Sequence, residues 1–449
     1  MVGSIVIIGA NAAGVNAAIA ARRVNRDADI ILITEEEDAA YSRCGLPYVL
    51  AGEIPRFGNL VMFSPSYFRS MRIELLTKTS VKTIDIYEKM ISVIHEDGKA
   101  ESIPYDVAVI ATGAMASTPS FKGCDKQGVF SLRTLNDGSR IRDALFQAEK
   151  AVVIGANMIG LQMAYALAKN NIRTTLVDRA SHVLQGDVDI DMARVVQKKV
   201  EENGVKLALG AEVNEIIGDG KARGVRVGGK VFDTDIVLLS TGIKPRTDLA
   251  KKIGCDLGTD GAVKVDCQMQ TSIQGVYAAG DCVETLSLIT GLPMLASLGT
   301  VAVRQGKTAG MNAAGGYSIF PGALCSRVSR VFDFEIGSTG LTEAKAMDSG
   351  LSTVSAVLNA KTKPEYFPGA RDISVKIVVE RDSGRIVGGQ VVGGEEVAQR
   401  INMMSIAIQC HATVWELSKV DTCYSPPVSE MWESTALTAD LANLMLRKG

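Results

Sequence analysis

The sequence lacks several features that would define other classes of protein. Its three histidines (His95, His182 and His411) are far apart and no two of its eight cysteines have CxxC spacing, so we expect no metal site. Lys plus Arg total 48 against 50 Asp plus Glu, and without a basic surplus we expect no nucleic-acid partner. No apolar run approaches the roughly 18 residues that span a bilayer, so we expect no membrane association. The N-terminus has no basic region and no small-residue cleavage site, which predicts a cytoplasmic protein.

The length of 449 residues predicts about three domains at about 150 residues each. Hydrophobic residues make up 47% and charged residues 22%, as in ordinary globular proteins. Glycine is frequent, with 44 residues, which is about a tenth of the chain against a usual share of about 7%. In a cytosolic protein most scattered thiols are small buried hydrophobes, so this is the expectation for all cysteines except Cys44.

One supersecondary unit occurs twice. The first copy has an apolar strand at Ser4–Ile8, a Gly/Ala turn at 9–14, a helix over 15–26 and a strand over 30–34. The second copy has a strand over 151–154, a turn over 155–160, a helix over 161–170 and a strand over 174–177. The strands are continuous apolar runs rather than alternating ones, which is typical of a buried parallel sheet.

Both turns have the pattern of a dinucleotide-binding fingerprint. Glycine permits the tight turn and the close approach of backbone to a pyrophosphate, which then lies at a helix N-terminus. An acid after the next strand accepts hydrogen bonds from ribose hydroxyls, and it follows the first glycine by 26 residues in one unit and by 23 in the other. The middle glycine is replaced by Asn11 and Asn157, a mild departure because asparagine tolerates left-handed backbone. The predicted binding residues are Gly9, Ala10, Asn11, Ala12, Gly14 and Glu35 in the first unit, and Gly155, Asn157, Ile159, Gly160 and Asp178 in the second.

Two dinucleotide sites in one chain indicate an electron relay from a nicotinamide to a flavin. Asp178 would repel a 2′-phosphate and so favours NADH over NADPH, although the adjacent Arg179 weakens this preference. The alternative is a pair of glycine-rich strand–helix turns that bind no ligand.

Cys44 lies shortly after the first unit, within the segment Tyr41–Tyr48. A cysteine that opens a helical turn experiences the helix dipole, and Arg43 adds positive charge, so both favour the thiolate. Gly45 leaves room for a planar ring or a substrate sulfur. The alternative is a buried structural cysteine.

The pattern changes after residue 318. Segments 373–379 and 386–392 flank the turn Asp382-Ser383-Gly384, which predicts a β-hairpin, and a helix is expected over 396–409. A mostly antiparallel sheet with helices is therefore expected at the C-terminus.

Three further motifs resemble those of the flavin-dependent pyridine nucleotide–disulfide oxidoreductases along nearly the whole chain. They are Tyr105-Asp106 to Ala111-Thr112-Gly113, Thr241-Gly242-Ile243-Lys244-Pro245, and Thr271 to Gly280-Asp281. The resemblance implies an α/β fold with two Rossmann-like dinucleotide-binding domains, for FAD and NAD, and a C-terminal α+β dimerisation domain. The implied segments are 1–112 and 245–318 for FAD, 113–244 for NAD(P)H and 319–449 for dimerisation. It also implies cofactor contacts from Ser42, Arg43, Thr112, Gly113, Gly242 and Gly280, and from Asp281 to the ribityl chain.

Within that family the chain resembles the single-cysteine branch. Dithiol members such as glutathione reductase have a second cysteine where this chain has Val49. The branch contains coenzyme A-disulfide reductases, NADH oxidases, NADH peroxidases and persulfide or polysulfide reductases. The peroxidases and water-forming oxidases have a histidine in the first turn, where this chain has Ala12.

Two segments resemble tyrosine motifs of the coenzyme A-disulfide reductases: Tyr424-Ser425-Pro426-Pro427, and Tyr366 with Phe367-Pro368-Gly369. In those enzymes both tyrosines reach the thiol site from the partner subunit, which implies a homodimer here. A phenol near a thiolate can protonate a departing thiol. Packing at the interface is the alternative role. Arg22 and Arg23 match in place the basic residues that hold the coenzyme A nucleotide, with ordinary solvated helix charges as the alternative.

The sequence therefore predicts an NADH- or NADPH-dependent FAD enzyme that reduces coenzyme A disulfide, or a related small disulfide or persulfide, through Cys44, with Tyr424 and Tyr366 in catalytic roles. The alternatives are an oxidase that passes electrons to oxygen, a coenzyme A-dependent persulfide or polysulfide reductase, a redox sensor, and electron transfer to a small iron–sulfur protein.

Overall fold

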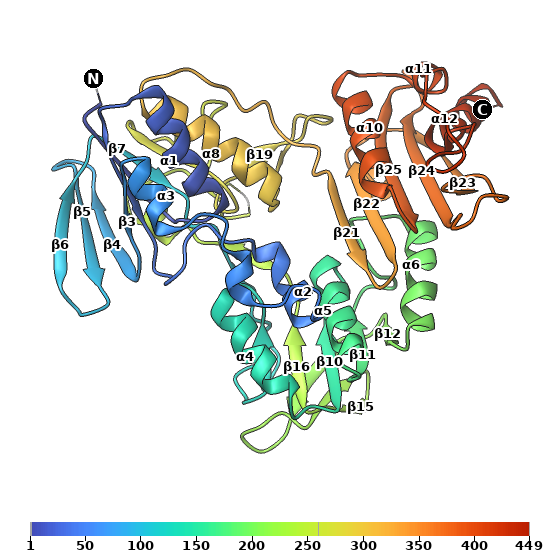
Figure 1. Cartoon of the computed structure of the whole chain (residues 1–449), viewed down its shortest axis with the longest axis horizontal. Coiled ribbons are helices and arrows are strands. Elements are labelled where there is room, and N and C mark those ends of the chain that lie inside the picture. Colours follow the sequence, from blue (N-terminus) through green and yellow to red (C-terminus); the bar gives the residue numbers. More distant parts are fainter. Residues whose placement is uncertain (1, 259, 449) are drawn as a thin grey trace. The chain divides into compact units, whose positions relative to one another are not determined.

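The computed structural model describes residues 2–258 and 260–448. The chain forms two compact units, each made of separate segments (Figure 1). One contains Met1–Leu46, Pro55–Ala116 and Ile243–Ala323, and the other contains Pro47–Ile54, Ser117–Gly242 and Leu324–Gly449. The predicted domain boundaries after residues 112, 244 and 318 stay predictions.

The first unit is built on a five-stranded sheet in the order β18-β7-β1-β2-β3, with every neighbouring pair parallel. Its strands are β1 (Ser4–Ile8), β2 (Asp29–Ile33), β3 (Ile73–Leu76), β7 (Val107–Ile110) and β18 (Val276–Ala278). The side chains of Ile5, Val6 and Ile7 have no exposed surface, which explains the continuous apolar run in the sequence.

Two long helices of this unit, α1 (Ala12–Val24) and α8 (Gly299–Ala313), pack against each other with almost no space between their backbones. A Cβ atom at Gly306 would lie 2.2 Å from the Ala13 carbonyl oxygen, and one at Gly310 would lie 2.1 Å from that of Ala17. Only glycine fits at these two crossings, and the close packing holds α1 over the sheet.

The remaining elements of the first unit surround this core. One is an antiparallel sheet of β4 (Thr79–Asp85), β5 (Met90–His95) and β6 (Ala100–Pro104). Two short strand pairs follow: β8 (Ala114–Ala116) pairs with β17 (Ile243–Pro245), and β19 (Thr285–Leu286) pairs with β20 (Pro293–Met294). The short helices are η2 (Phe57–Leu60), α3 (Pro65–Ser70) and α7 (Asp248–Lys252).

The second unit contains a similar parallel sheet, in the order β12-β11-β10-β16-β9. Its strands are β9 (Val129–Ser131), β10 (Lys150–Ile154), β11 (Arg173–Asp178), β12 (Lys206–Leu209) and β16 (Ile236–Leu239). Helices α4 (Leu135–Leu145), α5 (Met158–Lys169) and α6 (Ile190–Glu202) accompany it, with an antiparallel sheet of β13 (Val213–Ile217), β14 (Gly224–Val227) and β15 (Lys230–Asp233).

The C-terminal part of the second unit is an antiparallel sheet in the order β21-β22-β25-β24-β23. Its strands are β21 (Arg327–Val331), β22 (Phe334–Gly340), β23 (Thr353–Lys361), β24 (Asp372–Glu380) and β25 (Ile386–Gly393). The helices are α9 (Glu343–Asp348), α10 (Val397–Gln409), α11 (Val414–Leu417) and α12 (Ser434–Lys448). The predicted hairpin is β24–β25 and the predicted helix is α10.

The structure confirms the predicted fold class and both strand–turn–helix–strand repeats. The two repeat helices begin three residues before the predicted positions. Asn11 and Asn157 cap them, because each side chain accepts a hydrogen bond from a backbone N–H of the first turn, so the helix starts inside the predicted turn.

Candidate functional site

The first glycine-rich turn joins β1 to α1 at the carboxyl end of the parallel sheet. Gly9 has φ +110°, and a Cβ atom there would lie 2.1 Å from the Ala111 carbonyl oxygen. A Cβ atom at Gly14 would lie 1.7 Å from the Gly9 carbonyl oxygen. Both positions therefore require glycine, and the turn leaves the α1 N-terminus open to an anion.

Asn11 provides a test of whether this turn fits a cofactor. Its Oδ1 accepts the Ala12 N–H at 2.8 Å, while its buried Nδ2 donates to no described residue. A buried amide donor left without an acceptor costs about 1–3 kcal/mol. Phosphate oxygens at the helix N-terminus are acceptors of the required kind, so the residues fit a dinucleotide pyrophosphate here.

Glu35, the acid predicted to bind a ribose, is held by two side chains. Arg246 contacts its Oε2 at 2.9 Å and Ser80 donates to its Oε1 at 3.0 Å. Burial raises the pKa of Glu35, but the hydrogen bond and charge of Arg246, with the Ser80 hydrogen bond, outweigh it and leave this pKa below its ordinary value. Glu35 therefore stays an acceptor at neutral pH.

Arg246 is a residue that the sequence reasoning missed. Besides Glu35 it contacts two of the predicted cofactor residues, because Thr112 Oγ1 donates to its carbonyl oxygen at 2.6 Å and its own N–H donates to the Gly113 carbonyl at 2.9 Å. The feature of the sequence that could have identified Arg246 is its position directly after the motif Thr241-Gly242-Ile243-Lys244-Pro245.

Cys44 lies in the short 3-10 helix η1 (Arg43–Gly45), which leads directly into α2 (Leu46–Leu50). Its side chain is exposed and is not part of a disulfide. Ser42 precedes it as the N-cap residue, and the Gly45 N–H donates to the Ser42 carbonyl at 3.3 Å. A Cβ atom at Gly45 would lie 2.4 Å from the Leu60 side chain, so the turn carrying Cys44 packs closely.

Arg43, predicted to contact the cofactor and to favour the thiolate, forms an ion pair with Glu36 at 2.5 Å. Its guanidinium also lies over the Tyr41 ring, 5.4 Å from the centroid, and the Tyr41 hydroxyl donates to Glu36. Glu36 offsets part of the charge of Arg43, so its effect on the Cys44 thiol stays a prediction.

The segment that resembles the second FAD motif returns to the same sheet. Gly280 follows β18 with φ +89°, and its N–H donates to Gln305 of α8 at 2.9 Å. A Cβ atom at Gly280 would lie 2.9 Å from that of Ala13 on α1. Asp281 is partly exposed directly after this crossing, next to the first turn.

The second glycine-rich turn repeats this geometry. Gly155 has φ +110°, a Cβ atom there would lie 2.0 Å from the Ser240 carbonyl oxygen, and one at Gly160 would lie 1.8 Å from that of Gly155. Asn157 accepts the Gly160 N–H at 3.1 Å and donates to the Ser240 carbonyl at 2.6 Å. Unlike Asn11, Asn157 is satisfied within the protein.

The other predicted residues of the second site lie near this turn. Asp178 accepts the N–H of Ala156 at 2.6 Å and that of Ala180 at 2.8 Å, so its carboxylate is fixed beside the turn. Ile159 is 41% exposed on the first turn of α5. Gly242 has φ +97°, and a Cβ atom there would have no described atom within 4 Å beyond its chain neighbours.

The two predicted tyrosines lie together although 58 residues separate them. Their hydroxyls are 3.2 Å apart, and both side chains are exposed, Tyr366 at 73% and Tyr424 at 39%. The hydrogen bond with Tyr366 raises the pKa of Tyr424, so this phenol is protonated at neutral pH.

The contacts of Arg22 do not support its predicted role in substrate binding. It is 8% exposed, and its guanidinium donates to four backbone carbonyl groups, those of Met71, Arg72, Asn25 and Arg26. Arg22 therefore joins α1 to the segment that carries residues 71 and 72 of the same chain. Arg23 is exposed, so the proposed nucleotide contact rests on Arg23 alone.

The expectation that the other cysteines are mostly buried is wrong. Among the described residues Cys255 and Cys282 are buried and Cys124 and Cys325 partly so, whereas Cys267, Cys410 and Cys423 are exposed. Within the described residues no cluster of His, Cys, Asp or Glu could hold a metal ion.

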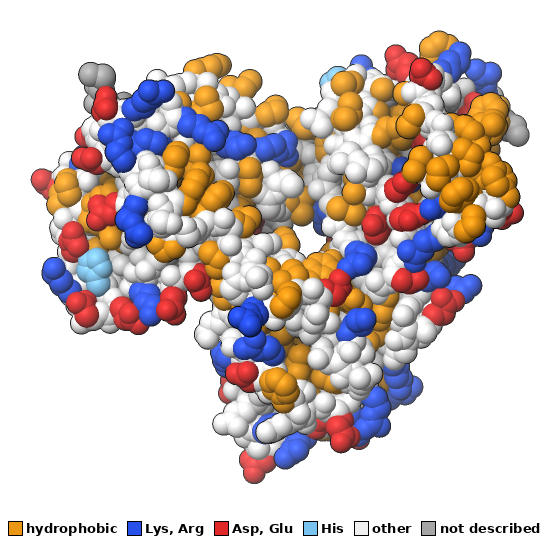
Figure 2. Space-filling view, viewed as in Figure 1, with side chains coloured by type: hydrophobic (Ala, Val, Ile, Leu, Met, Phe, Trp, Pro, Cys, Tyr) orange, Lys and Arg blue, Asp and Glu red, His pale blue; other side chains and the backbone are white. Residues whose placement is uncertain are grey.

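Large apolar side chains are exposed in the C-terminal part of the chain, and Figure 2 shows an apolar patch where Figure 1 places α12. The exposed large apolar residues of this part of the chain include Ile406 on α10, Trp415 on α11, Leu444 and Met445 on α12, and Val428, Met431 and Trp432 between α11 and α12. An exposed apolar surface is typical of a protein–protein interface.

Among residues 2–258 and 260–448, no helix has the length and apolar character to cross a membrane, and the cytoplasmic location stays a prediction.

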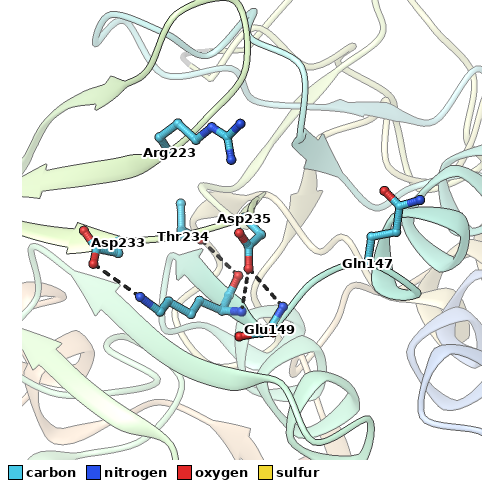
Figure 3. A pocket seen from close by; sticks show the side chains of 7 residues that line it. Gln147, Glu149, Arg223, Asp233, Thr234 and Asp235 are labelled. Atoms are coloured by element: carbon cyan, nitrogen blue, oxygen red, sulfur yellow. Dashed lines mark hydrogen bonds and ion pairs between the residues drawn. The ribbon is translucent and has the colours of Figure 1, made fainter.

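A separate hollow of about 380 Å³ lies at the amino ends of β10 and β16, opposite the second glycine-rich turn (Figure 3). Asp235 accepts the N–H groups of Glu149 and Lys150, at 2.9 and 3.0 Å, and Asp233 pairs with the Lys150 ammonium at 3.3 Å. The two aspartates thus have their hydrogen-bond and ion-pair partners within the hollow, and none of the predicted site residues lines it.

Two family models match the chain. A model described as pyridine nucleotide-disulphide oxidoreductase matches residues 3–306, and one described as the dimerisation domain of that family matches residues 328–436. The chain therefore belongs to the pyridine nucleotide-disulphide oxidoreductases and is an NAD(P)H-dependent flavoprotein oxidoreductase. The predicted resemblance is confirmed.

Similar proteins carry more specific names. An NADH oxidase of Methanocaldococcus jannaschii is 42% identical over 97% of both chains. An NAD(P)H coenzyme A polysulfide/persulfide reductase of Pyrococcus horikoshii is 33% identical over 97% of both chains. The structure of an NAD-dependent persulfide reductase from A. fulgidus is 35% identical, with a TM-score of 0.96 over 99% of this chain and 84% of that one.

Proposed function

We propose that this protein uses NADH and FAD to reduce coenzyme A disulfide, or a related small disulfide or persulfide, at Cys44. The observation that supports this most directly is the exposed Cys44 thiol in a helical turn shortly after the first dinucleotide unit. Positions 43–50 contain no second cysteine, so a substrate sulfur rather than an internal thiol would bond to Cys44. The P. horikoshii relative, named for coenzyme A, supports the same substrate class.

The proposed chemistry of Cys44 is thiol–disulfide exchange. Its thiolate attacks one sulfur of the substrate disulfide, the substrate S–S bond breaks, and one thiolate leaves while the other half stays bonded to Cys44. Bound FAD would supply the two electrons taken as hydride from NADH. Two-electron reduction of the mixed disulfide would release the second thiolate and restore the Cys44 thiolate. Two protons, one from the transferred hydride and one from solvent, would complete the two product thiols.

The tyrosine pair supports a homodimeric site. A phenol held protonated by its neighbour is a proton donor for a departing thiolate. We propose that Tyr424 and Tyr366 of the partner subunit complete the Cys44 site, with the exposed apolar surface of the C-terminal part as the interface. Arg23 would contact the coenzyme A nucleotide.

Reduction of oxygen is the second candidate, favoured by the 42% identity to the M. jannaschii NADH oxidase. Ala12 places no proton donor in the first turn, and this argues against the water-forming reaction rather than the peroxide-forming one. Oxygen reduction by a flavin does not require Cys44, and this difference separates the two candidates.

The deciding experiment is the intact mass of the denatured protein with and without reductant. A reducible adduct of coenzyme A mass on Cys44 supports the disulfide reductase, and an adduct of sulfur atoms alone supports persulfide chemistry. NADH turnover is then compared in Cys44→Ser and in Cys267→Ser, which removes an exposed thiol of the same unit. Loss of coenzyme A-disulfide turnover only in Cys44→Ser is expected, whereas equal turnover in both variants refutes the proposal.

A further inference from the structure

The segment after Asp178 is attached to the second glycine-rich turn. The Leu184 N–H donates to the Ala156 carbonyl at 2.8 Å, and the Ala156 N–H donates to the Asp178 carboxylate at 2.6 Å. Leu184 itself has φ +56° and is 1% exposed. Residues 179–191, which we name the connecting segment, thus begin at the candidate ribose-binding acid and are fixed to the turn that would hold the pyrophosphate.

The other end of the connecting segment is attached to the C-terminal antiparallel sheet. Asp187 pairs with Arg327 of β21. Asp189 pairs with Lys376 of β24 at 3.2 Å, and it exchanges two hydrogen bonds with Gln390 of β25, at 2.8 and 2.6 Å. Every second residue over 187–191 is an aspartate, and their cationic partners lie on the C-terminal sheet.

Lys376 is the centre of this attachment. It is 1% exposed and also contacts Asp191 at 2.8 Å and Glu343 at 2.7 Å. Burial lowers the pKa of Lys376, but the hydrogen bonds to Asp191 and Glu343 and the charge of Asp189 outweigh it and raise the pKa above its ordinary value. A buried ion pair is maintained only with good geometry, so this group defines the position of the segment narrowly.

The path from the sheet to the turn is short. Arg327 holds Asp187, whose N–H donates to the Leu184 carbonyl at 2.8 Å, and the Leu184 N–H holds the Ala156 carbonyl. Neither Arg327 nor Lys376 belongs to the parallel sheet of the second unit, and both contact the connecting segment. Moving that segment would move both Asp178 and the turn.

We propose that Arg327 and Lys376 are positioning residues for dinucleotide binding at the second glycine-rich turn. This inference rests on the proposed binding of NADH there. The C-terminal sheet then has a role beyond dimerisation, because its charged residues set the affinity for NADH.

The test uses the FAD-loaded enzyme and measures NAD⁺ binding by calorimetry together with steady-state kinetics. In Arg327→Met we expect the dissociation constant of NAD⁺ and the KM for NADH to rise about tenfold, with kcat at saturating NADH and the flavin content unchanged. The matched control is Arg226→Met, which removes a half-exposed ion pair with Glu215 (2.9 Å) on β13 and β14 of the same unit. We expect it to bind as the wild type does.

Lys376→Met removes the only cation paired with the buried Asp189 carboxylate among the described residues and can prevent folding. Asp187→Asn is therefore the second variant, and it too should weaken NAD⁺ binding about tenfold. NAD⁺ affinity equal to wild type in both Arg327→Met and Asp187→Asn overturns the inference, as does a parallel loss of kcat and flavin, which marks a purely structural role. Failure of the wild-type enzyme to bind NAD⁺ refutes the proposed function instead.

Discussion

Asn11→Asp separates the cofactor role of the first turn from its structural role. The variant keeps the Oδ1 that accepts the Ala12 N–H and replaces only Nδ2, which has no partner among the described residues. A negative charge at the N-terminus of α1 interacts favourably with the helix dipole, by about 0.3–1 kcal/mol. The stability of the FAD-free protein should therefore be unchanged or slightly higher.

FAD binding should change in the opposite direction. The variant loses a hydrogen bond to a phosphate oxygen, worth about 1.5–3 kcal/mol for a charged acceptor. It also places a carboxylate near the pyrophosphate, and like charges about 4 Å apart near a protein surface repel by about 4 kcal/mol. The two effects together amount to about 5.5–7 kcal/mol, which corresponds to FAD affinity weaker by about 10⁴-fold or more.

The assay pairs urea unfolding of the FAD-free protein with titration by FAD, followed by the change in flavin fluorescence. The matched variant is Asn157→Asp, in which the lost Nδ2 donates to the Ser240 carbonyl at 2.6 Å. That variant should lose about 1–3 kcal/mol of stability and bind FAD normally. Wild-type FAD affinity in Asn11→Asp would refute the assignment of the unpartnered amide to the cofactor.

Two further predictions follow from the contacts. Tyr366→Phe removes the hydrogen bond that raises the pKa of Tyr424, so this pKa should fall toward about 10. Because a phenol acts as an acid only below its pKa, the alkaline limb of the kcat–pH profile should move to lower pH. An unchanged limb would exclude Tyr424 as the acid, and Tyr317→Phe is the exposed control. Gly306→Ala forces a Cβ atom against the Ala13 carbonyl and should cost about 1–3 kcal/mol in urea unfolding. Gly299→Ala, in open space at the start of α8, should instead add about 0.4–1 kcal/mol, and equal effects of the two would refute the packing argument.

The fold was predictable where local pattern and burial agree. The first strand was predicted with its observed bounds, Ser4–Ile8, because its apolar run is buried on both faces. Contacts between distant residues were not predictable from local pattern. Glu35 pairs with Arg246, which is 211 positions away in the sequence. Arg22 has the sequence context of a charge on an exposed helix face, yet it is buried and donates hydrogen bonds to the carbonyl groups of residues 71 and 72.

The two turns show why the same motif does not guarantee the same site. In each, the carbonyl oxygen of the residue directly after a neighbouring strand approaches the first glycine: Ala111 after β7 in one turn, and Ser240 after β16 in the other. The Ser240 hydroxyl donates to Asn157 Oδ1 at 2.7 Å, and the Asn157 amide donates to the Ser240 carbonyl. Alanine has no hydroxyl to hold the asparagine oxygen, so the Asn11 oxygen accepts the Ala12 N–H and its amide has no acceptor among the residues that the structure describes. We therefore expect a difference about 100 residues away from Asn11 to decide which of the two turns donates a side-chain hydrogen bond to a dinucleotide.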